Sequence, residues 1–187
     1  MSDHTSSPPL ARALPVAHPL DEFYARAGLE LPRIERVEGE EVPEPYRSLL
    51  VHKRDMTPTL EKHHGDEIHL RILSHEKRED FYFREVVLQL NGNDKPVEFG
   101  AIKMNLGIFQ PRERQLILGE HLPLGTILNV CGTTHSTIAK AFFRIDADEL
   151  ICRVLNLPKP ATLYGRRANI LDPQKRRLAE IVEILPP

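Results

Sequence analysis

The sequence predicts an α+β fold, in which helices pack on a mostly antiparallel sheet. Several segments alternate apolar and polar residues, as half-buried strands do. Two of them, 81–90 and 97–104, are joined by Asn91-Gly92-Asn93-Asp94, which is typical of a tight hairpin turn. The helix signals cluster at the start and middle of the chain instead of alternating with the strands. This arrangement favours an antiparallel sheet over a parallel one.

Length and composition indicate one domain. The chain has 187 residues, and 41% of them are hydrophobic, which is enough to form a core. Residues 1–20 are polar and interrupted by prolines, so we expect a flexible N-terminal arm there and a single domain over 21–187. The 25 basic and 27 acidic residues give a net charge of −2, so no nucleic-acid partner is expected.

Nothing in the sequence predicts a membrane-spanning or secreted protein. No apolar run approaches the roughly 20 residues that a membrane span needs. The N-terminus lacks the basic segment and apolar run of a signal peptide. Cys131 and Cys152 are far apart, which indicates free thiols in a reducing compartment. We therefore expect a cytoplasmic protein, and a monomer or weak dimer.

Start and stop residues indicate where the helices lie. In the clearest case Thr57 is a good N-cap, Pro58 suits the first helical position and Gly65 suits the stop. A helix is therefore predicted over 58–64, with Met56 on the loop that enters it. The other predicted helices cover residues 21–27, 45–52, 111–118 and 146–157, and the stretch 121–128 turns into a further short helix or strand.

The predicted strands cover residues 66–73, 81–90, 97–104, 136–145, 163–170 and 178–185. The strand 81–90 organises the rest, because it is rich in aromatic and β-branched residues and contains no Gly or Pro. Side chains alternate along a strand, so Arg84 shares the more apolar face with Tyr82, Val86 and Leu88. An unpaired guanidinium there would be costly, so Arg84 needs an anion.

That anion is either an internal carboxylate or a ligand carboxylate, which arginine grips with two parallel hydrogen bonds. The last strand offers a candidate for the first alternative, since Glu183 also falls on an apolar face. Glu183 is then either the structural partner of Arg84 or the other end of one ligand pocket. Arg166 and Arg167 are consecutive on the strand 163–170 and face opposite ways, so at most one of them joins Arg84 inside.

A metal site receives little support from the sequence. His63, His64 and His69, with Asp66 and Glu67, resemble a metal cluster in composition. Adjacent histidines near a helix end, without a second ligand group at a recognised spacing, are usually solvated. The chain also lacks a phosphate-binding Gly-rich loop and a nucleophile elbow. No metal and no cofactor are expected.

Several short motifs, in this order, resemble those of the chorismate pyruvate-lyase (4-hydroxybenzoate synthase) family and its relatives. The resemblance covers roughly residues 45–187. The motifs are Leu49-Leu50 through Asp55-Met56-Thr57, Tyr82-Phe83-Arg84-Glu85-Val86, Pro123-Leu124-Gly125, and Leu163-Tyr164-Gly165-Arg166-Arg167 with Glu183-Ile184-Leu185-Pro186.

The resemblance implies a chorismate lyase-like domain whose antiparallel sheet encloses a small ligand cavity. It implies that Arg84 binds a ring carboxylate and that Glu183 contacts a ring hydroxyl. It also implies that Met56 and Leu124 line the site from covering flaps, and that Gly125 allows close backbone approach. The implied reaction converts chorismate to 4-hydroxybenzoate and pyruvate. The alternative is a non-catalytic binding module for small aromatic carboxylates.

The sequence departs from that family at one position. Enzymes of the family have a second Arg in the strand after the hairpin, where this chain reads Gly100-Ala101-Ile102. Arg166, Arg167 or Lys103 would have to hold the second carboxylate of a cyclohexadienyl substrate. We further expect Arg84 and Glu183 to lie at opposite ends of one cavity, with Glu183 buried and without a contacting cation.

Overall fold

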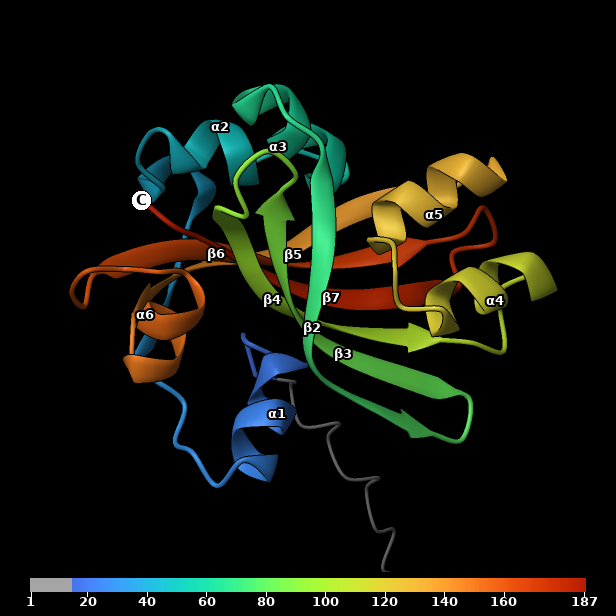
Figure 1. Cartoon of the computed structure of the whole chain (residues 1–187), viewed down its shortest axis with the longest axis horizontal. Coiled ribbons are helices and arrows are strands. Elements are labelled where there is room, and N and C mark those ends of the chain that lie inside the picture. Colours follow the sequence, from blue (N-terminus) through green and yellow to red (C-terminus); the bar gives the residue numbers. More distant parts are fainter. Residues whose placement is uncertain (1–14) are drawn as a thin grey trace, which may run out of the picture.

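The computed structural model describes residues 15–187. At its centre is a seven-stranded sheet in the order β1-β5-β6-β7-β4-β3-β2, and all neighbouring strands in it are antiparallel (Figure 1). The predicted α+β class is therefore confirmed. The strands are β1 (Ile34–Val37), β2 (Ile68–Arg78), β3 (Phe81–Leu90), β4 (Pro96–Asn105), β5 (Ser136–Asp146), β6 (Thr162–Leu171) and β7 (Arg177–Leu185). The helices are α1 (Leu20–Arg26), the short 3-10 helix η1 (Gly39–Glu41), α2 (Tyr46–Leu50), α3 (Met56–His64), α4 (Pro111–Leu118), α5 (Leu124–Cys131) and α6 (Glu149–Val154).

The strands differ from prediction mainly at the two edges of the sheet. β1 was not predicted, because its 4 residues are too few to show an alternating pattern. It forms at the edge by pairing with β5, where Ile34 lies opposite Ile145. β2 continues to Arg78, beyond the predicted end at residue 73, because its polar second half pairs with β3. In both cases a neighbouring strand pairs with the backbone N–H and C=O groups of the segment, and the local sequence pattern does not reveal that pairing.

Helix α3 begins at Met56, so the prediction that Met56 lies on the entering loop is wrong. Asp55 is the N-cap residue by its backbone conformation, and its side chain makes no capping hydrogen bond. Pro58 is then the third helical residue, which is tolerated because the first-turn N–H groups have no partner within the helix. Helix α6 is shorter than predicted, since Asp148 caps it by accepting a hydrogen bond from the Ile151 N–H.

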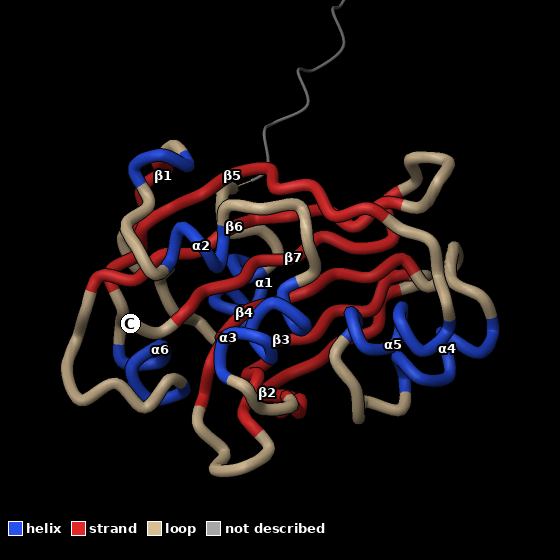
Figure 2. Tube along the Cα trace, turned by 90° about the horizontal axis from the view of Figure 1, so that it is seen from above, coloured by secondary structure: helices blue, strands red, loops and turns tan. Residues whose placement is uncertain are grey.

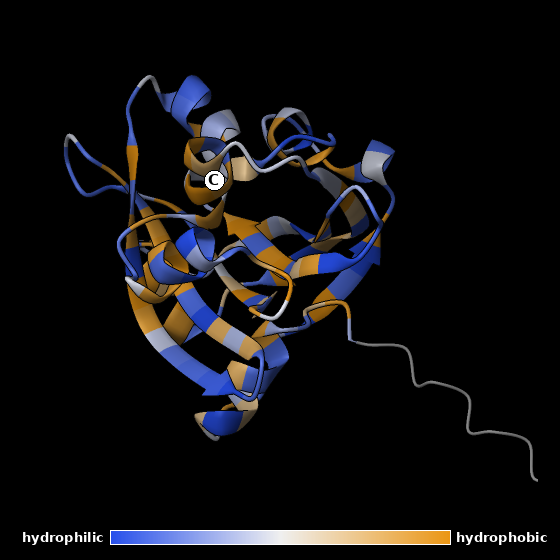
Figure 3. Ribbon diagram, turned by 90° about the vertical axis from the view of Figure 1, so that its right-hand side faces the viewer, coloured by the Kyte–Doolittle hydropathy of each residue, from blue (hydrophilic) through white to orange (hydrophobic). Residues whose placement is uncertain are grey.

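Strand alternation gives the sheet two differently covered faces (Figures 2 and 3). One face packs against α1 and α6, and its core includes Phe83, Val87 and Phe99. On the other face, α4 and α5 pack on one half of the sheet and α2 and α3 on the other half. Tyr82 belongs to the first half and Leu88 to the second. Arg84 lies between Tyr82 and Leu88 along β3, so it lies where the two clusters meet.

The predicted arm over residues 1–20 lies mostly outside the described residues, which begin at Pro15. At its end, Ala17 and Leu20 are buried in the core beside α1, so the packed part of the chain includes residues before 21. Within residues 15–187, no helix is long and apolar enough to cross a membrane.

Candidate functional site

A cavity of about 60 Å³ lies between the sheet and the helices α3 and α5. A single water molecule needs only about 10–15 Å³ of such space, so the cavity has room for a larger occupant. Its walls are mostly aliphatic, and its polar groups come from six separate segments of the chain. Those polar residues are Asp55, Thr57, Arg84, Glu98, Thr137, Arg166 and Glu183.

Arg84 is a deeply buried cation in the cavity wall. Its side chain extends from β3 among Val86, Leu88 and Ile102, and the residue is only 1% exposed. Among the described residues, Nε and Nη1 of Arg84 have no hydrogen-bond partner. Burial lowers the pKa of Arg84 to about 10, so the guanidinium is still charged at neutral pH. A charge buried in this way can be compensated by an anion that enters the cavity.

Arg166 is the second arginine in the cavity wall, and it is fully engaged. It lies opposite Glu183 in the β6–β7 pairing, and Arg166 Nε donates to Glu183 Oε2. Its terminal nitrogens donate to the carbonyl oxygens of Leu50 and His52 at 3.3 Å and of Arg54 at 3.2 Å. Arg166 thus ties the sheet to the connector between α2 and α3.

The expectation that Glu183 has no contacting cation is therefore wrong. Strand register places Arg166 directly beside Glu183, and Glu183 is 3% exposed. Arg84 and Glu183 both line the cavity, and among residues 15–187 no ion pair joins them. Arg166 also affects His52, because burial and the nearby guanidinium charge lower the pKa of that imidazole to about 4.

Glu98 is a cavity residue that the sequence prediction missed. It lies on β4 opposite Leu88, is 4% exposed, and its Oε2 has no hydrogen-bond partner in the described part of the chain. Burial raises the pKa of Glu98 well above its ordinary range, and the negative charge of Glu183 raises it further, while Arg166 opposes this. The signal was available, because alternation along 97–104 puts Glu98 on the same face as Ile102.

Asp55 connects the start of α3 to β5 at the cavity wall. Asp55 Oδ2 lies 2.7 Å from His135 Nε2, and Thr137 Oγ1 donates to Asp55 Oδ1 at 2.5 Å. Burial would raise the pKa of Asp55, but the hydrogen bonds from His135 and Thr137 outweigh it and lower that pKa. The same contact raises the pKa of His135. Because the Asp55 carboxylate is occupied in this way, it does not cap α3.

The cavity also includes the predicted flap residues Met56, Leu124 and Gly125. Met56 and Leu124 are buried, at 4% and 5% exposure. A Cβ atom added to Gly125 would make only ordinary contacts, the nearest at 3.5 Å from Thr57 Oγ1. Gly100, by contrast, lies close to the neighbouring strand, because a Cβ there would lie 2.1 Å from the Val182 carbonyl oxygen.

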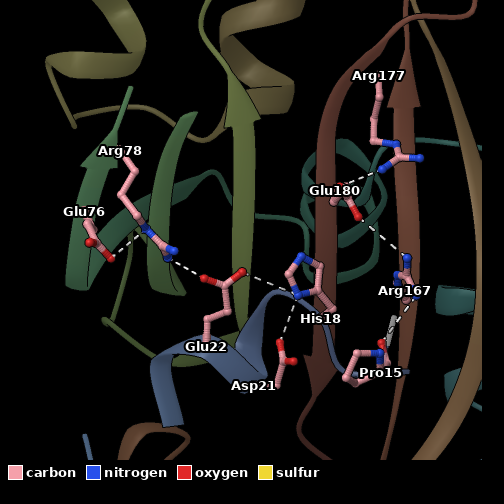
Figure 4. Close-up of polar contacts among 9 residues, drawn as sticks. All are labelled: Pro15, His18, Asp21, Glu22, Glu76, Arg78, Arg167, Arg177 and Glu180. Atoms are coloured by element: carbon pink, nitrogen blue, oxygen red, sulfur yellow. Dashed lines mark hydrogen bonds and ion pairs between the residues drawn. The ribbon is translucent and has the colours of Figure 1, made fainter. Parts of the chain in front are cut away.

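Arg167 does not line the cavity, because alternation along β6 sends it to the opposite face of the sheet. There it lies 3.6 Å from Glu180 and donates to the Pro15 carbonyl oxygen (Figure 4). Lys103 also points away, with its ammonium 4.6 Å from the centre of the Phe81 ring. The side chain of Ala101 belongs to the core beside α1 and α6, although this residue borders the cavity. Neither Arg167 nor Lys103 therefore supplies a second free cation.

The strand order, the helices on both faces and the cavity together decide the type of fold. It is the chorismate lyase-like fold. The solved structures similar to this chain include the effector domain of PhnF, which shares this fold. No protein-family model matches the sequence, and no curated protein is similar to it.

Three solved structures illustrate the likeness. PhnF from Mycobacterium smegmatis matches with a TM-score of 0.53 and 12% identity, over 91% of this chain and 93% of that one. The effector domain of PhnF matches with a TM-score of 0.52 and 12% identity, over 70% of this chain and 87% of that one. A GntR-family transcriptional regulator from Bacillus cereus has a TM-score of 0.46 and 12% identity, over 64% and 92%. At such identities the likeness concerns the fold alone.

Proposed function

We propose that this domain binds a small aromatic carboxylate, with the carboxylate group on Arg84. The unpaired guanidinium of Arg84 inside a mostly aliphatic cavity carries the proposal. A carboxylate accepts two parallel hydrogen bonds from arginine, and the aliphatic walls favour an apolar ring over a sugar or a phosphate ester. The proposal also agrees with the fold, since PhnF has an effector domain of this type.

Binding is tested by titrating 4-hydroxybenzoate into the protein in a calorimeter. Arg84→Met should weaken binding by about 100-fold or more, because losing one partner of a buried ion pair costs about 3–5 kcal/mol. Arg167→Met is the matched control, since it removes a neighbouring arginine on the other face of the sheet. Normal affinity in Arg84→Met, or equal losses in the two variants, would contradict the proposal.

Chorismate lysis is the second candidate function. The observation that favours it is that one cavity contains Arg84, Glu183, Met56 and Leu124, to which the family resemblance assigns substrate contacts. In this reaction the ring carbon bearing the hydroxyl loses a proton, the neighbouring enolpyruvyl ether departs, and the ring becomes aromatic. Enolpyruvate then gives pyruvate. Catalysis would come from holding the substrate in an eliminating conformation and stabilising the leaving group.

Incubation with chorismate, followed by chromatography for 4-hydroxybenzoate and pyruvate, distinguishes the two functions. We expect slow turnover at most, because Arg166 is already engaged by Glu183 and three carbonyl groups. Lacking one charge-assisted contact in the transition state typically costs about 10²–10³ in rate. Product formation no faster than the spontaneous background would leave binding as the function.

A further inference from the structure

Two groups in the cavity have polar atoms without partners, and they have opposite chemical character. Nε and Nη1 of Arg84 are unpaired donors, and Oε2 of Glu98 has no partner among residues 15–187. The remaining charged groups in the wall are engaged, since Glu183 bonds to Arg166 and Asp55 bonds to His135. A bound ligand can therefore satisfy two otherwise unpaired groups, one with each of its ends.

Strand register shows that these two groups lie at different ends of the cavity. Arg84 lies opposite Ile102, whereas Glu98 lies opposite Leu88. Leu88 follows Arg84 by four residues on the same strand, which separates the two positions by about 13 Å along the sheet. Both side chains line the cavity, so a ligand that spans it can contact both. In the described part of the chain they form no ion pair with each other.

We propose that Glu98 determines specificity at the end of the cavity away from Arg84, where its free carboxyl oxygen binds the hydroxyl group of a hydroxylated aromatic acid. This inference rests on the proposed function, in which Arg84 holds the carboxylate. It assigns to Glu98 the contact that the family resemblance implies for Glu183. Glu183 is the poorer candidate, because its carboxylate already accepts a hydrogen bond from Arg166.

The charges of the wall support a hydroxyl group at this end. Arg166 and Glu183 form a neutral pair, so Arg84 leaves one positive charge for the ligand to balance. Burial and the proximity of Glu183 raise the pKa of Glu98 well above its ordinary range, which favours the neutral carboxyl group. A neutral carboxyl group both donates and accepts hydrogen bonds, so it can donate to a ligand hydroxyl group or accept from one. A second carboxylate on the ligand would find no free cation here.

The test compares 4-hydroxybenzoate with benzoate by calorimetry on the native protein, Glu98→Leu, Glu98→Gln and Glu183→Gln. The native protein should prefer 4-hydroxybenzoate by about 10- to 100-fold, because benzoate leaves Glu98 unpaired. Glu98→Leu should lose that preference and keep its affinity for benzoate. Glu98→Gln, which is neutral and still hydrogen-bonds, should keep part of it and serves as the variant closest in shape to the native side chain.

The outcomes separate this inference from the proposed function. Equal affinities of the native protein for the two acids would overturn the role of Glu98 and leave binding at Arg84 intact. A preference that persists in Glu98→Leu but disappears in Glu183→Gln would assign the hydroxyl to Glu183 and overturn the inference. Failure of the native protein to bind either acid would overturn both. Thermal melting of each variant shows whether a loss of binding reflects unfolding.

Discussion

Arg84→Met should make the ligand-free protein more stable, although it removes the residue on which the proposed binding depends. Burial lowers the pKa of Arg84 from 12.5 to about 10. A pKa difference of one corresponds to about 1.4 kcal/mol, so the fold disfavours the charged side chain by about 3 kcal/mol. Because a lowered pKa penalises the protonated form, this cost is fully present at every pH below about 10.

Methionine fills a similar, apolar volume and carries no charge. Since relaxation and solvent penetration reduce the cost of burying a charge in a real protein, we expect a gain of about 1–3 kcal/mol in the free energy of unfolding. For a domain of this size each kcal/mol shifts Tm by about 2–4 °C. The gain is measured by thermal melting and by urea denaturation, both followed by circular dichroism.

Arg166→Met is the matched comparison, because Arg166 is equally buried but fully paired. Its loss removes the donor to Glu183 and to the His52 and Arg54 carbonyl oxygens, so we expect a loss of about 3–5 kcal/mol in the free energy of unfolding. The same substitution should thus raise the free energy of unfolding at Arg84 and lower it at Arg166. A fall in Tm for Arg84→Met comparable to that for Arg166→Met would refute this reasoning and make Arg84 a structural residue.

Three further predictions follow from the cavity and its surroundings. The His135–Asp55 pair should stabilise the protein most between about pH 4 and 6.5, because the raised pKa of His135 contributes fully below 6.5 and the lowered pKa of Asp55 contributes fully above 3.8. His135→Asn should therefore lower the free energy of unfolding by about 1 kcal/mol near pH 5.5 and by less near pH 9. Thermal melting at the two pH values measures this, and equal Tm differences would contradict it. Ala101→Arg should lower the free energy of unfolding by several kcal/mol, measured by urea denaturation, since it buries a charge in the core beside α1 and α6. A variant that is as stable as the native protein and lyses chorismate faster would contradict this expectation. Exhaustive chelation should leave the affinity for 4-hydroxybenzoate unchanged in calorimetry, whereas a loss restored by zinc would point back to the histidines His63, His64 and His69.

Local patterns in the sequence predicted the sheet and the direction of its important side chains. The two-residue period of a strand depends only on neighbouring residues, so the orientation of Arg84 could be inferred before its surroundings were known. The same period predicted that Arg166 and Arg167 face opposite ways, and the structure shows that Arg166 is the one in the cavity. The same period also places Glu98 on the cavity face of β4, beside Ile102.

Local sequence patterns therefore predicted six of the seven strands, the hairpin between β3 and β4, and the placement of Arg84 and Glu183 on apolar faces. Which charges meet depends on the tertiary structure. Arg166 and Glu183 pair because β6 and β7 adopt one particular register, and Asp55 reaches His135 because α3 packs beside β5. Register and helix packing depend on contacts between residues far apart in the chain, which no local pattern encodes. Those same distant contacts leave Nε and Nη1 of Arg84 without a partner among residues 15–187, which is why we propose Arg84 as the residue that holds a ligand.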